Sequence, residues 1–360
     1  MDFKHNYKDC KNVQEAVIVR DGKTVIWFNN WFSSLAYTIE NLKNSNSDLV
    51  IIGTNVSTDC PYSKSVDIFE IEPKVWGEKY IEWALGFCKK YGIDIVFARY
   101  HVNEIAQNIE RFENIGVNIV CEDISIYNAM ESKSKVYEFL ASKGYTEIPE
   151  YYVANTTAEF EKFFGIIDNS GNKVCTKFDH DEGAQSFRLI TDSLISETSL
   201  NSTLENVMTY DNMVAILNKM ELAGKMKPLM VMPKLLSPEV SVDCYNSMTE
   251  GFIAIPRYKY GSRIKEIKLN QDLIDNCAKI QKIYGFKYGF NVQFRWASNG
   301  EFKLLEINPR LSGGIHLTDM CGFSIVRQIV GDILCCKTNQ SIKDIHEVRL
   351  TQVEKPVILS

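Results

Sequence analysis

The sequence predicts an α/β (α+β) protein in which a Rossmann-like parallel-sheet domain precedes a two-part fold rich in β-strands. The 360 residues suffice for two or three domains. Short β-rich runs alternate with helical stretches between residues 24 and 120, and strand-like runs dominate after residue 229. Apolar residues make up 45% and charged residues 24% of the chain, which is the usage of a folded globular protein.

The N-terminal part contains five apolar runs separated by segments with helical spacing. The runs are Val25–Phe28, Leu49–Ile52, Val66–Ile71, Ile93–Ala98 and Val117–Val120, and the helical segments include 76–90 and 102–114. This order is typical of βαβ units. It predicts a parallel sheet with helices on both faces and a ligand crevice at the carboxyl ends of the strands.

Polar residues follow these runs where the crevice is expected. Asn29, Asn55, Arg99 and His101 stand at or just after the strand ends. Arg99 and His101 are therefore candidates for binding an acceptor substrate, although polar residues are common in any loop. The first turn, residues 29–34, contains no glycine, so a pyrophosphate cannot be approached as in NAD-binding proteins.

The middle of the chain has the pattern of a small lid-like subdomain. A helix is expected from about Glu131 to Lys143, stopped by Gly144, followed by a strand at 174–177, a small-residue loop at 179–186 and a returning strand at 187–190. Residues 191–206 are rich in Ser, Thr and Asn and indicate a surface connection, and 211–222 reads as a helix.

A hairpin is predicted near the C-terminus. Further strands are expected at 229–232, 240–245, 252–255, 288–296 and 302–307, and Asn299-Gly300 is a strong signal for a two-residue turn between the last two. That turn places Gln293 opposite Glu306, Asn291 opposite Asn308 and Arg295 opposite Leu304. The other face of the hairpin, carrying Val292, Phe294, Leu305 and Ile307, is expected to contact the core.

The polar face of this hairpin suits a hard cation. Directly opposed side chains have Cβ atoms about 5 Å apart, so Gln293, Glu306 and Asn308 could share one magnesium ion. The alternative is a solvated sheet face. A carboxylate, an amide and Arg310 in close succession before Gly313-Gly314 favour the metal, because arginine suits a phosphate bridged by magnesium. This pattern indicates a nucleoside triphosphate site.

These residues carry a resemblance to a known superfamily. Asn291-Val-Gln-Phe followed by Leu305-Glu-Ile-Asn-Pro-Arg-Leu-Ser-Gly-Gly resembles the ATP-grasp enzymes, in particular the synthetase domains of the carbamoyl phosphate synthetase large subunit and short carboxylate-amine ligases. The resemblance implies a two-part ATP-grasp fold after the first domain. It also implies ATP and two magnesium ions as cofactors, with Gln293, Glu306 and Asn308 as metal ligands and Arg310 against the transferring phosphoryl group.

Other positions match the superfamily through their order along the chain. Lys133 and Lys177 correspond to two lysines that contact ATP phosphates, and Lys177 is also expected to position the transferring group. Residues 230–236, with Lys234 and Leu236, resemble the hinge that binds adenine through its backbone, and Glu239 stands where a carboxylate reaches the ribose. Each lysine could alternatively be a surface residue. The phosphate-covering loop departs from the family because residues 179–186 contain only one glycine.

The domains expected on this basis are a preceding α/β domain at 1–125, a linking helix and lid at 126–228, and a C-terminal subdomain at 229–360. The resemblance implies an ADP-forming ligase that activates a carboxylate as an acyl phosphate for attack by an amine. Two alternatives stay open: a small-molecule kinase, and an ATP-binding regulator with little turnover. The chain is too short for a complete carbamoyl phosphate synthetase, so that activity is not expected.

Composition limits the partners and the compartment. Forty basic and 46 acidic residues give a net charge of −6 without long runs of one sign, so we expect small-molecule partners and neither nucleic acid nor membrane. A homodimer is left open. No apolar secretory core or membrane span is evident, the ten cysteines show no Cys-x-x-Cys, and the five histidines are scattered. We therefore expect a cytoplasmic protein with reduced thiols and without a zinc site.

Overall fold

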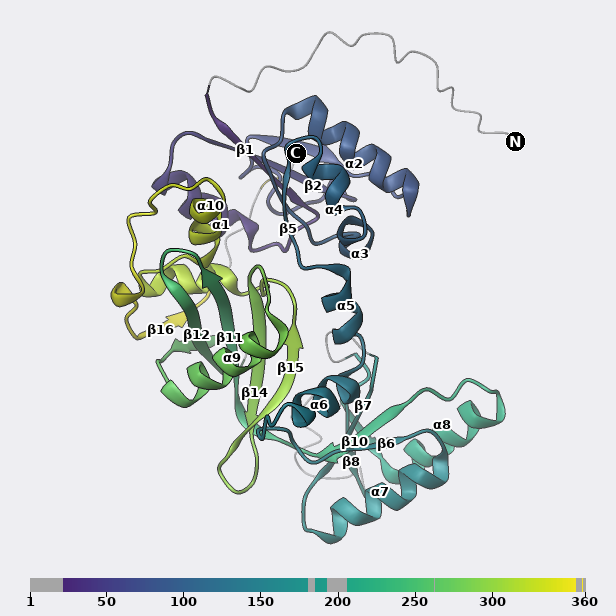
Figure 1. The fold of residues 1–360 in the computed structure, drawn as a ribbon. Coiled ribbons are helices and arrows are strands. Elements are labelled where there is room, and N and C mark those ends of the chain that lie inside the picture. Colours follow the sequence, from purple (N-terminus) through teal and green to yellow (C-terminus); the bar gives the residue numbers. More distant parts are fainter. Residues whose placement is uncertain (1–21, 181–184, 193–205, 262, 354–357, 359–360) are drawn as a thin grey trace, which may run out of the picture.

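The computed structural model describes residues 22–180, 185–192, 206–261, 263–353 and 358 (Figure 1). The described strands form three sheets, which we call A, B and C, with strand orders β3-β2-β1-β4-β5, β6-β10-β7-β8-β9 and β15-β14-β11-β12-β13-β16. Figure 1 shows sheet A at one end of the molecule, sheet B at the other and sheet C beside helix α6. No helix in these described ranges is long and apolar enough to cross a membrane.

Sheet A is the parallel sheet predicted from the N-terminal pattern. Its strands are β1 Thr24–Asn29, β2 Leu49–Asn55, β3 Ile68–Ile71, β4 Ile95–Phe97 and β5 Asn118–Val120, and every neighbouring pair is parallel. Alternate residues of β1 serve two cores: Ile26 and Phe28 face one, and Val25 and Trp27 the other. Burial on both faces explains the continuous apolar runs of the sequence.

The helices of this domain are α1 Leu35–Ser45, α2 Glu78–Tyr91, α3 Val102–Ala106 and α4 Ile109–Glu113. The single helix expected over 102–114 is wrong, because the chain leaves helical geometry at Asn108 (φ −125°, ψ 18°). The Asn108 side chain donates to the carbonyl of Glu104 at 2.9 Å. Such local bonds from asparagine compete with the backbone ladder of a helix.

A linker leads from sheet A to sheet B. It contains α5 Ile124–Met130 and α6 Lys133–Ser142, and α6 agrees with the helix expected at 131–143. Sheet B consists of β6 Tyr152–Ala154, β7 Val174–Phe178, β8 Arg188–Thr191, β9 Val207–Thr209 and β10 Leu229–Pro233, with α7 Thr157–Asn169 and α8 Tyr210–Leu222 sharing its apolar core. Sheet B thus reaches five residues past position 228. Most of the expected lid loop and surface connection, 181–184 and 193–205, lies outside the described residues.

Sheet C forms most of the C-terminal part. Its strands are β11 Leu236–Ser247, β12 Gly251–Tyr260, β13 Ile264–Ile267, β14 Phe290–Trp296, β15 Phe302–Asn308 and β16 Val348–Thr351, and all neighbouring pairs are antiparallel. One face packs on α6 and on α9 Gln271–Tyr284. The chain also forms the 3₁₀ turns η2 Ile315–Cys321 and η3 Ile342–Asp344 and helix α10 Ile325–Ile333.

The β14–β15 hairpin differs from its prediction in two places. Ala297 accepts from Gly300 N at 3.0 Å and pairs with Glu301, so the loop has three residues, 298–300, with Gly300 in the left-handed region (φ 87°). The two-residue turn was wrong; three-residue loops of this kind are the next most common hairpin connection. In addition, the pairing register shifts between Gln293 and Phe294.

This register shift is a β-bulge at Leu305, which has no opposite residue in the ladder. Arg295 consequently lies opposite Lys303 and not Leu304. Leu304 takes the core position expected for Leu305, whereas Leu305 packs with a different cluster, against Cys175 and Met232 of sheet B. The two departures compensate each other, so Gln293 lies opposite Glu306 and Asn291 opposite Asn308, as predicted.

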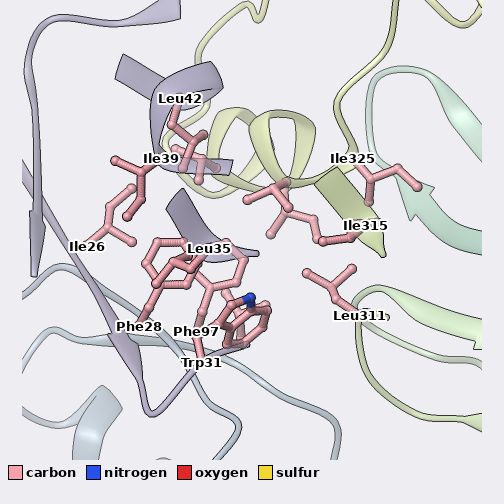
Figure 2. Close-up of a cluster of buried hydrophobic side chains, with 14 of the residues drawn as sticks. Ile26, Phe28, Trp31, Leu35, Ile39, Leu42, Phe97, Leu311, Ile315 and Ile325 are labelled. Atoms are coloured by element: carbon pink, nitrogen blue, oxygen red, sulfur yellow. The ribbon is translucent and has the colours of Figure 1, made fainter. Parts of the chain in front are cut away.

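Sheet A and the C-terminal part share one apolar core. Figure 2 shows Ile26, Phe28 and Leu35 of the first domain gathered with Leu311, Ile315 and Ile325, and these side chains are almost completely buried. Ser34 at the start of α1 also donates to the Gly313 carbonyl at 2.8 Å. These contacts hold the turn after β1 against the segment that follows Arg310.

Candidate active site

The three expected metal ligands lie on one face of the β14–β15 hairpin. Gln293 is directly opposite Glu306, and Asn308 follows two residues later on the same face and donates from Nδ2 to Glu306 Oε1 at 3.0 Å. All three side chains are half-buried. The Asn308 amide uses its nitrogen for this bond, so its oxygen does not take part in it. One carboxylate and two amide oxygens form a donor set that fits magnesium.

Two lysines from distant segments lie near Glu306. Lys177 is in β7, is 7% exposed, and approaches the Leu305 carbonyl at 3.5 Å through Nζ. The pKa of Lys177 is lowered to about 8, chiefly by burial and also by the nearby charge of Lys133, while the charge of Glu306 opposes the shift. The structure therefore brings Lys133, Lys177 and Glu306 together. A cluster of two cations and one anion, of which Lys177 is buried and the other two are half-buried, is well suited to a polyanionic ligand.

Asp179 fixes the position of Lys133. Ser132 caps α6 by accepting from Lys135 N, and Asp179 accepts from the Ser132 hydroxyl and, at 2.7 Å, from the Ser134 N–H. The Lys133 N–H donates to the Asp179 carbonyl at 3.3 Å. The start of α6 is thus fastened to the end of β7. The sequence analysis placed Asp179 in the lid loop and missed this role, which depends on contacts 45 or more residues apart.

The segment expected to bind adenine connects sheets B and C. Lys234 lies between β10 and β11 and donates its N–H to the Lys173 carbonyl at 2.7 Å, and Leu236 begins β11 and is 48% exposed. Glu239 forms ion pairs with Lys259 and, at 3.0 Å, with Arg295. Burial raises the pKa of Glu239, but these two cations outweigh it, so that its pKa is lowered overall and the group is a carboxylate at neutral pH.

Arg310 and Arg99 meet at one aromatic ring. The Arg99 guanidinium lies 4.1 Å and the Arg310 guanidinium 5.6 Å from the centre of the Phe32 ring. Arg99 also donates to the Asn30 carbonyl at 2.6 Å. A Cβ on Gly313 would lie 3.2 Å from the Phe32 ring, so this glycine permits the close approach. The carboxyl end of sheet A is therefore adjacent to the segment that follows the β14–β15 hairpin, and Phe32 is a residue that the sequence analysis missed.

His101, the second candidate for acceptor binding, lies in a different environment. It is 9% exposed, and its ring stands 4.0 Å from the rings of Tyr80 and Tyr100. Its Nδ1 atom pairs with Glu104 at 2.9 Å. The ring thus packs against Tyr80 of α2 and Tyr100 of the loop after β4, whereas Arg99 lies beside Arg310.

A small cavity lies at the predicted crevice. Its volume is about 20 Å³, room for a single water molecule. It is lined by the ends of β4 and β5 and by the segment around Arg310. Glu122, at its edge, accepts backbone bonds from Lys287 at 2.9 Å and Tyr288 at 2.7 Å, and burial raises its pKa. Glu122 therefore ties the end of sheet A to the start of β14.

A buried polar network continues the face of sheet C that carries Gln293 and Glu306. Arg257 is 3% exposed, pairs with Asp243 at 3.1 Å, and contacts the hydroxyls of Ser241 and Ser312. Arg257, Ser241, Gln293 and Glu306 are cross-strand neighbours in one row. The alternation of Ser241 and Asp243 with valines was a signal that could have revealed this face, but nothing in the sequence marks Arg257 as its partner.

The neighbourhood of Arg257 is tightly packed. A Cβ on Gly314 would lie 2.7 Å from the guanidinium, so only glycine fits there without displacing the arginine. His316 is also buried, and its burial together with the Arg257 charge lowers its pKa to about 4. His316 is therefore neutral at physiological pH. The glycine pair after Arg310 thus provides two close approaches, one to Phe32 and one to Arg257.

Comparisons with known proteins give one family match and a set of similar structures. Residues 225–356 match the family described as "ATP-grasp in the biosynthetic pathway with Ter operon", a segment that contains Gln293, Glu306, Asn308 and Arg310. No curated protein matches the chain.

Solved structures resemble most of the chain. N5-carboxyaminoimidazole synthetase from Staphylococcus aureus, complexed with ADP, has a TM-score of 0.61 at 15% identity, covering 88% of this chain and 78% of that one. Biotin carboxylase from Campylobacter jejuni, in a complex with β,γ-ATP, has a TM-score of 0.63 at 15% identity, with coverages of 89% and 73%. The biotin carboxylase domain dimer of the Hydrogenobacter thermophilus 2-oxoglutarate carboxylase, with MgADP, ADP and bicarbonate, has a TM-score of 0.62 at 14% identity, with coverages of 89% and 72%.

These findings confirm the class of fold. The chain has the ATP-grasp fold preceded by a parallel-sheet α/β domain, as the resemblance implied. At these identities the structural likeness defines the fold alone. Function must be argued from the residues of this chain.

Proposed function

We propose that the protein is an ATP-dependent ligase that converts a carboxylate to an acyl phosphate, with release of ADP, and transfers the acyl group to an amine, with release of phosphate. The observation that carries this proposal is the convergence of Lys133 and Lys177 on the hairpin edge that bears Glu306. Phosphoryl transfer requires charge neutralisation and alignment more than a protein nucleophile.

Gln293, Glu306 and Asn308 would hold magnesium, and we propose two ions at this site. Bound magnesium would neutralise charge on the ATP phosphates. Lys133 and Lys177 would bind the phosphates from the opposite side, with Lys177 reaching the terminal group. Arg310 follows the metal ligands by two residues and would contact the transferring phosphoryl group.

An apolar cluster between sheets B and C suits the adenine ring. Cys175, Met232 and Leu235 are buried together, and Leu305 packs against them from the bulge. We propose that adenine binds against this cluster and bonds to the backbone of residues 230–236, including Lys234 and Leu236. Glu239 is ionised and lies at the start of β11, so its carboxylate can accept from the ribose hydroxyls once it rotates from one of its two cations.

The acceptor carboxylate would bind where sheet A meets the hairpin. Arg99 and Arg310 share the Phe32 ring, so a carboxylate paired with Arg99 lies near the phosphoryl group held by Arg310. Positioning of this kind can supply several kcal/mol of the barrier reduction. We propose His101, two residues after Arg99, as a second residue for binding the acceptor. We also propose small carboxylates and amines as the substrates, in a cytoplasmic setting.

Release of ADP tests the proposal. The full-length protein would be incubated with magnesium, ATP and pools of carboxylates, with and without pools of amines. A ligase gives stoichiometric ADP, phosphate and an amide only when both pools are present. ADP formation with one pool and without amide would identify a kinase, and ATP binding without ADP release would identify a regulator.

A further inference from the structure

The register of the β14–β15 hairpin decides where Glu306 points. Near the turn, Phe294 lies opposite Leu304 and Trp296 opposite Phe302. If that register continued, Glu306 would lie opposite Val292 and Asn308 opposite Phe290, two residues that are fully buried in the core under α9. A shift of one residue exchanges the two faces of a strand. The bulge at Leu305 supplies this shift and brings Glu306 and Asn308 to the cleft face.

Tyr137 holds the backbone at this bulge. Its hydroxyl donates to the Leu305 carbonyl at 2.6 Å and lies 3.1 Å from the Leu304 carbonyl. Leu305 has no opposite residue in the ladder, and its carbonyl has hydrogen-bond partners from outside the hairpin. Lys177 Nζ approaches the same oxygen at 3.5 Å, a longer contact than that of Tyr137.

Tyr137 also lies one turn after Lys133 in α6, and its side chain is 1% exposed. Figure 1 shows α6 between β14–β15 and the strands of sheet B. Helix α6 therefore carries Lys133, which we propose to bind ATP phosphate, at its first residue. One turn later it carries the Tyr137 hydroxyl, which bonds to the β15 strand that bears Glu306.

We propose that Tyr137 is a positioning residue for magnesium binding: by holding the Leu305 bulge, it keeps Glu306 and Asn308 on the cleft face. This inference rests on the proposed metal–ATP function. It differs from a mere packing role, because deleting the hydroxyl would weaken magnesium binding while leaving the ring in the core. The affinity for magnesium would fall, whereas nucleotide binding without metal would change much less.

Tyr145 provides a matched control. It packs in the same core as Tyr137, is 4% exposed, and its hydroxyl has no hydrogen-bond partner among the described residues. Tyr145→Phe thus removes a buried hydroxyl that holds nothing, whereas Tyr137→Phe removes one that holds the bulge. Both changes delete a single oxygen atom from the same core, so their general effects on packing should be similar.

The test is calorimetric titration of ADP into each variant across a series of MgCl₂ concentrations and in EDTA, with thermal unfolding measured in parallel. We expect Tyr137→Phe to raise the magnesium concentration for half-maximal tightening of ADP binding at least tenfold, with ADP binding in EDTA unchanged. Tyr145→Phe should match the wild type. Replacing Tyr137 by p-aminophenylalanine restores a hydrogen-bond donor at the same place. This variant should return the magnesium concentration for half-maximal tightening to the wild-type value.

The outcomes that oppose the inference are distinct from those that oppose the proposed function. An unchanged magnesium requirement in Tyr137→Phe, or equal shifts in the two phenylalanine variants, would overturn the positioning role. If Tyr137→Phe unfolds while the p-aminophenylalanine variant folds but retains a raised magnesium requirement, the role is also overturned. Absence of magnesium-dependent nucleotide binding in the wild type would overturn the proposed function itself, and the inference with it.

Discussion

Replacing Lys177 by methionine should stabilise the unliganded protein and weaken ATP binding. The pKa of Lys177 is about 8 in the folded protein against an ordinary value of 10.5. Because the folded pKa is the lower one, the unfolded chain binds more protons between these two pH values, and stability rises with pH across this window. The charged lysine therefore destabilises the fold below about pH 8, and this cost vanishes as the pH approaches 10.5.

The size of the effect follows from the shift. At about 1.4 kcal/mol per pKa unit, the difference corresponds to about 3 kcal/mol at pH 7. Methionine retains most of the apolar stem and removes the charge, and the 3.5 Å contact with Leu305 that it loses is long for a hydrogen bond. We expect Lys177→Met to raise the unfolding free energy by up to this amount, while its affinity for ATP falls more than its affinity for ADP.

Urea denaturation at several pH values measures the change in unfolding free energy. Calorimetry with ATP and with ADP measures the change in nucleotide affinity. Lys173→Met, at an exposed lysine just before β7, is the matched control and should leave both quantities near the wild type. The reasoning is refuted if Lys177→Met is no more stable than the wild type at pH 7, or if its advantage persists unchanged at pH 10. Equal losses of ATP and ADP affinity would place Lys177 on an inner phosphate.

Three further substitutions address the metal, the acceptor and the buried network. Glu306→Gln should abolish magnesium-dependent ATP turnover with an unchanged unfolding midpoint; near-normal turnover at saturating magnesium would place the metal elsewhere. Arg99→Ala should raise the KM for the carboxylate substrate at least tenfold, or about 1.4 kcal/mol, with ATP binding unaffected; an unchanged KM in steady-state kinetics would remove Arg99 from the acceptor site. Asp243→Asn leaves the Arg257 charge buried without its counter-ion, so urea denaturation should show a loss of about 3 to 5 kcal/mol. A loss below about 1 kcal/mol would mean that the two serine hydroxyls suffice.

The parallel sheet was predictable because its inner strands β1, β2 and β4 are buried on both faces and therefore appear as apolar runs. The pairing of Gln293 with Glu306 was also predicted correctly, but through a turn that the protein does not use. The bulge could not be predicted, since it depends on a bond between Tyr137 and a carbonyl 168 residues away. Local patterns reveal which strands exist, whereas irregularities of the backbone depend on distant partners.

In the candidate site, too, residues close together in the sequence were predictable, whereas residues that depend on distant partners were not. Gln293, Glu306 and Asn308 lie on two adjacent strands and Arg310 follows two residues later, so a short stretch of sequence was enough to propose all four as candidates. Phe32 and Arg257 were missed because each acquires its surroundings from a segment that is distant in the chain. For both residues a glycine after Arg310 creates the space, and such a requirement is visible only once the partners are in place.

The compensation between the three-residue turn and the Leu305 bulge has a consequence for how this hairpin tolerates changes in length. A hairpin with a two-residue turn and no bulge would hold Gln293 opposite Glu306 with the same number of residues between them. Residue spacing alone therefore does not distinguish the two architectures, and a lineage could exchange one for the other without moving the proposed metal ligands. If the loop keeps its three residues, insertions of an even number of residues at the tip would preserve the face that carries Gln293 and Glu306, whereas odd insertions would require a bulge to be gained or lost.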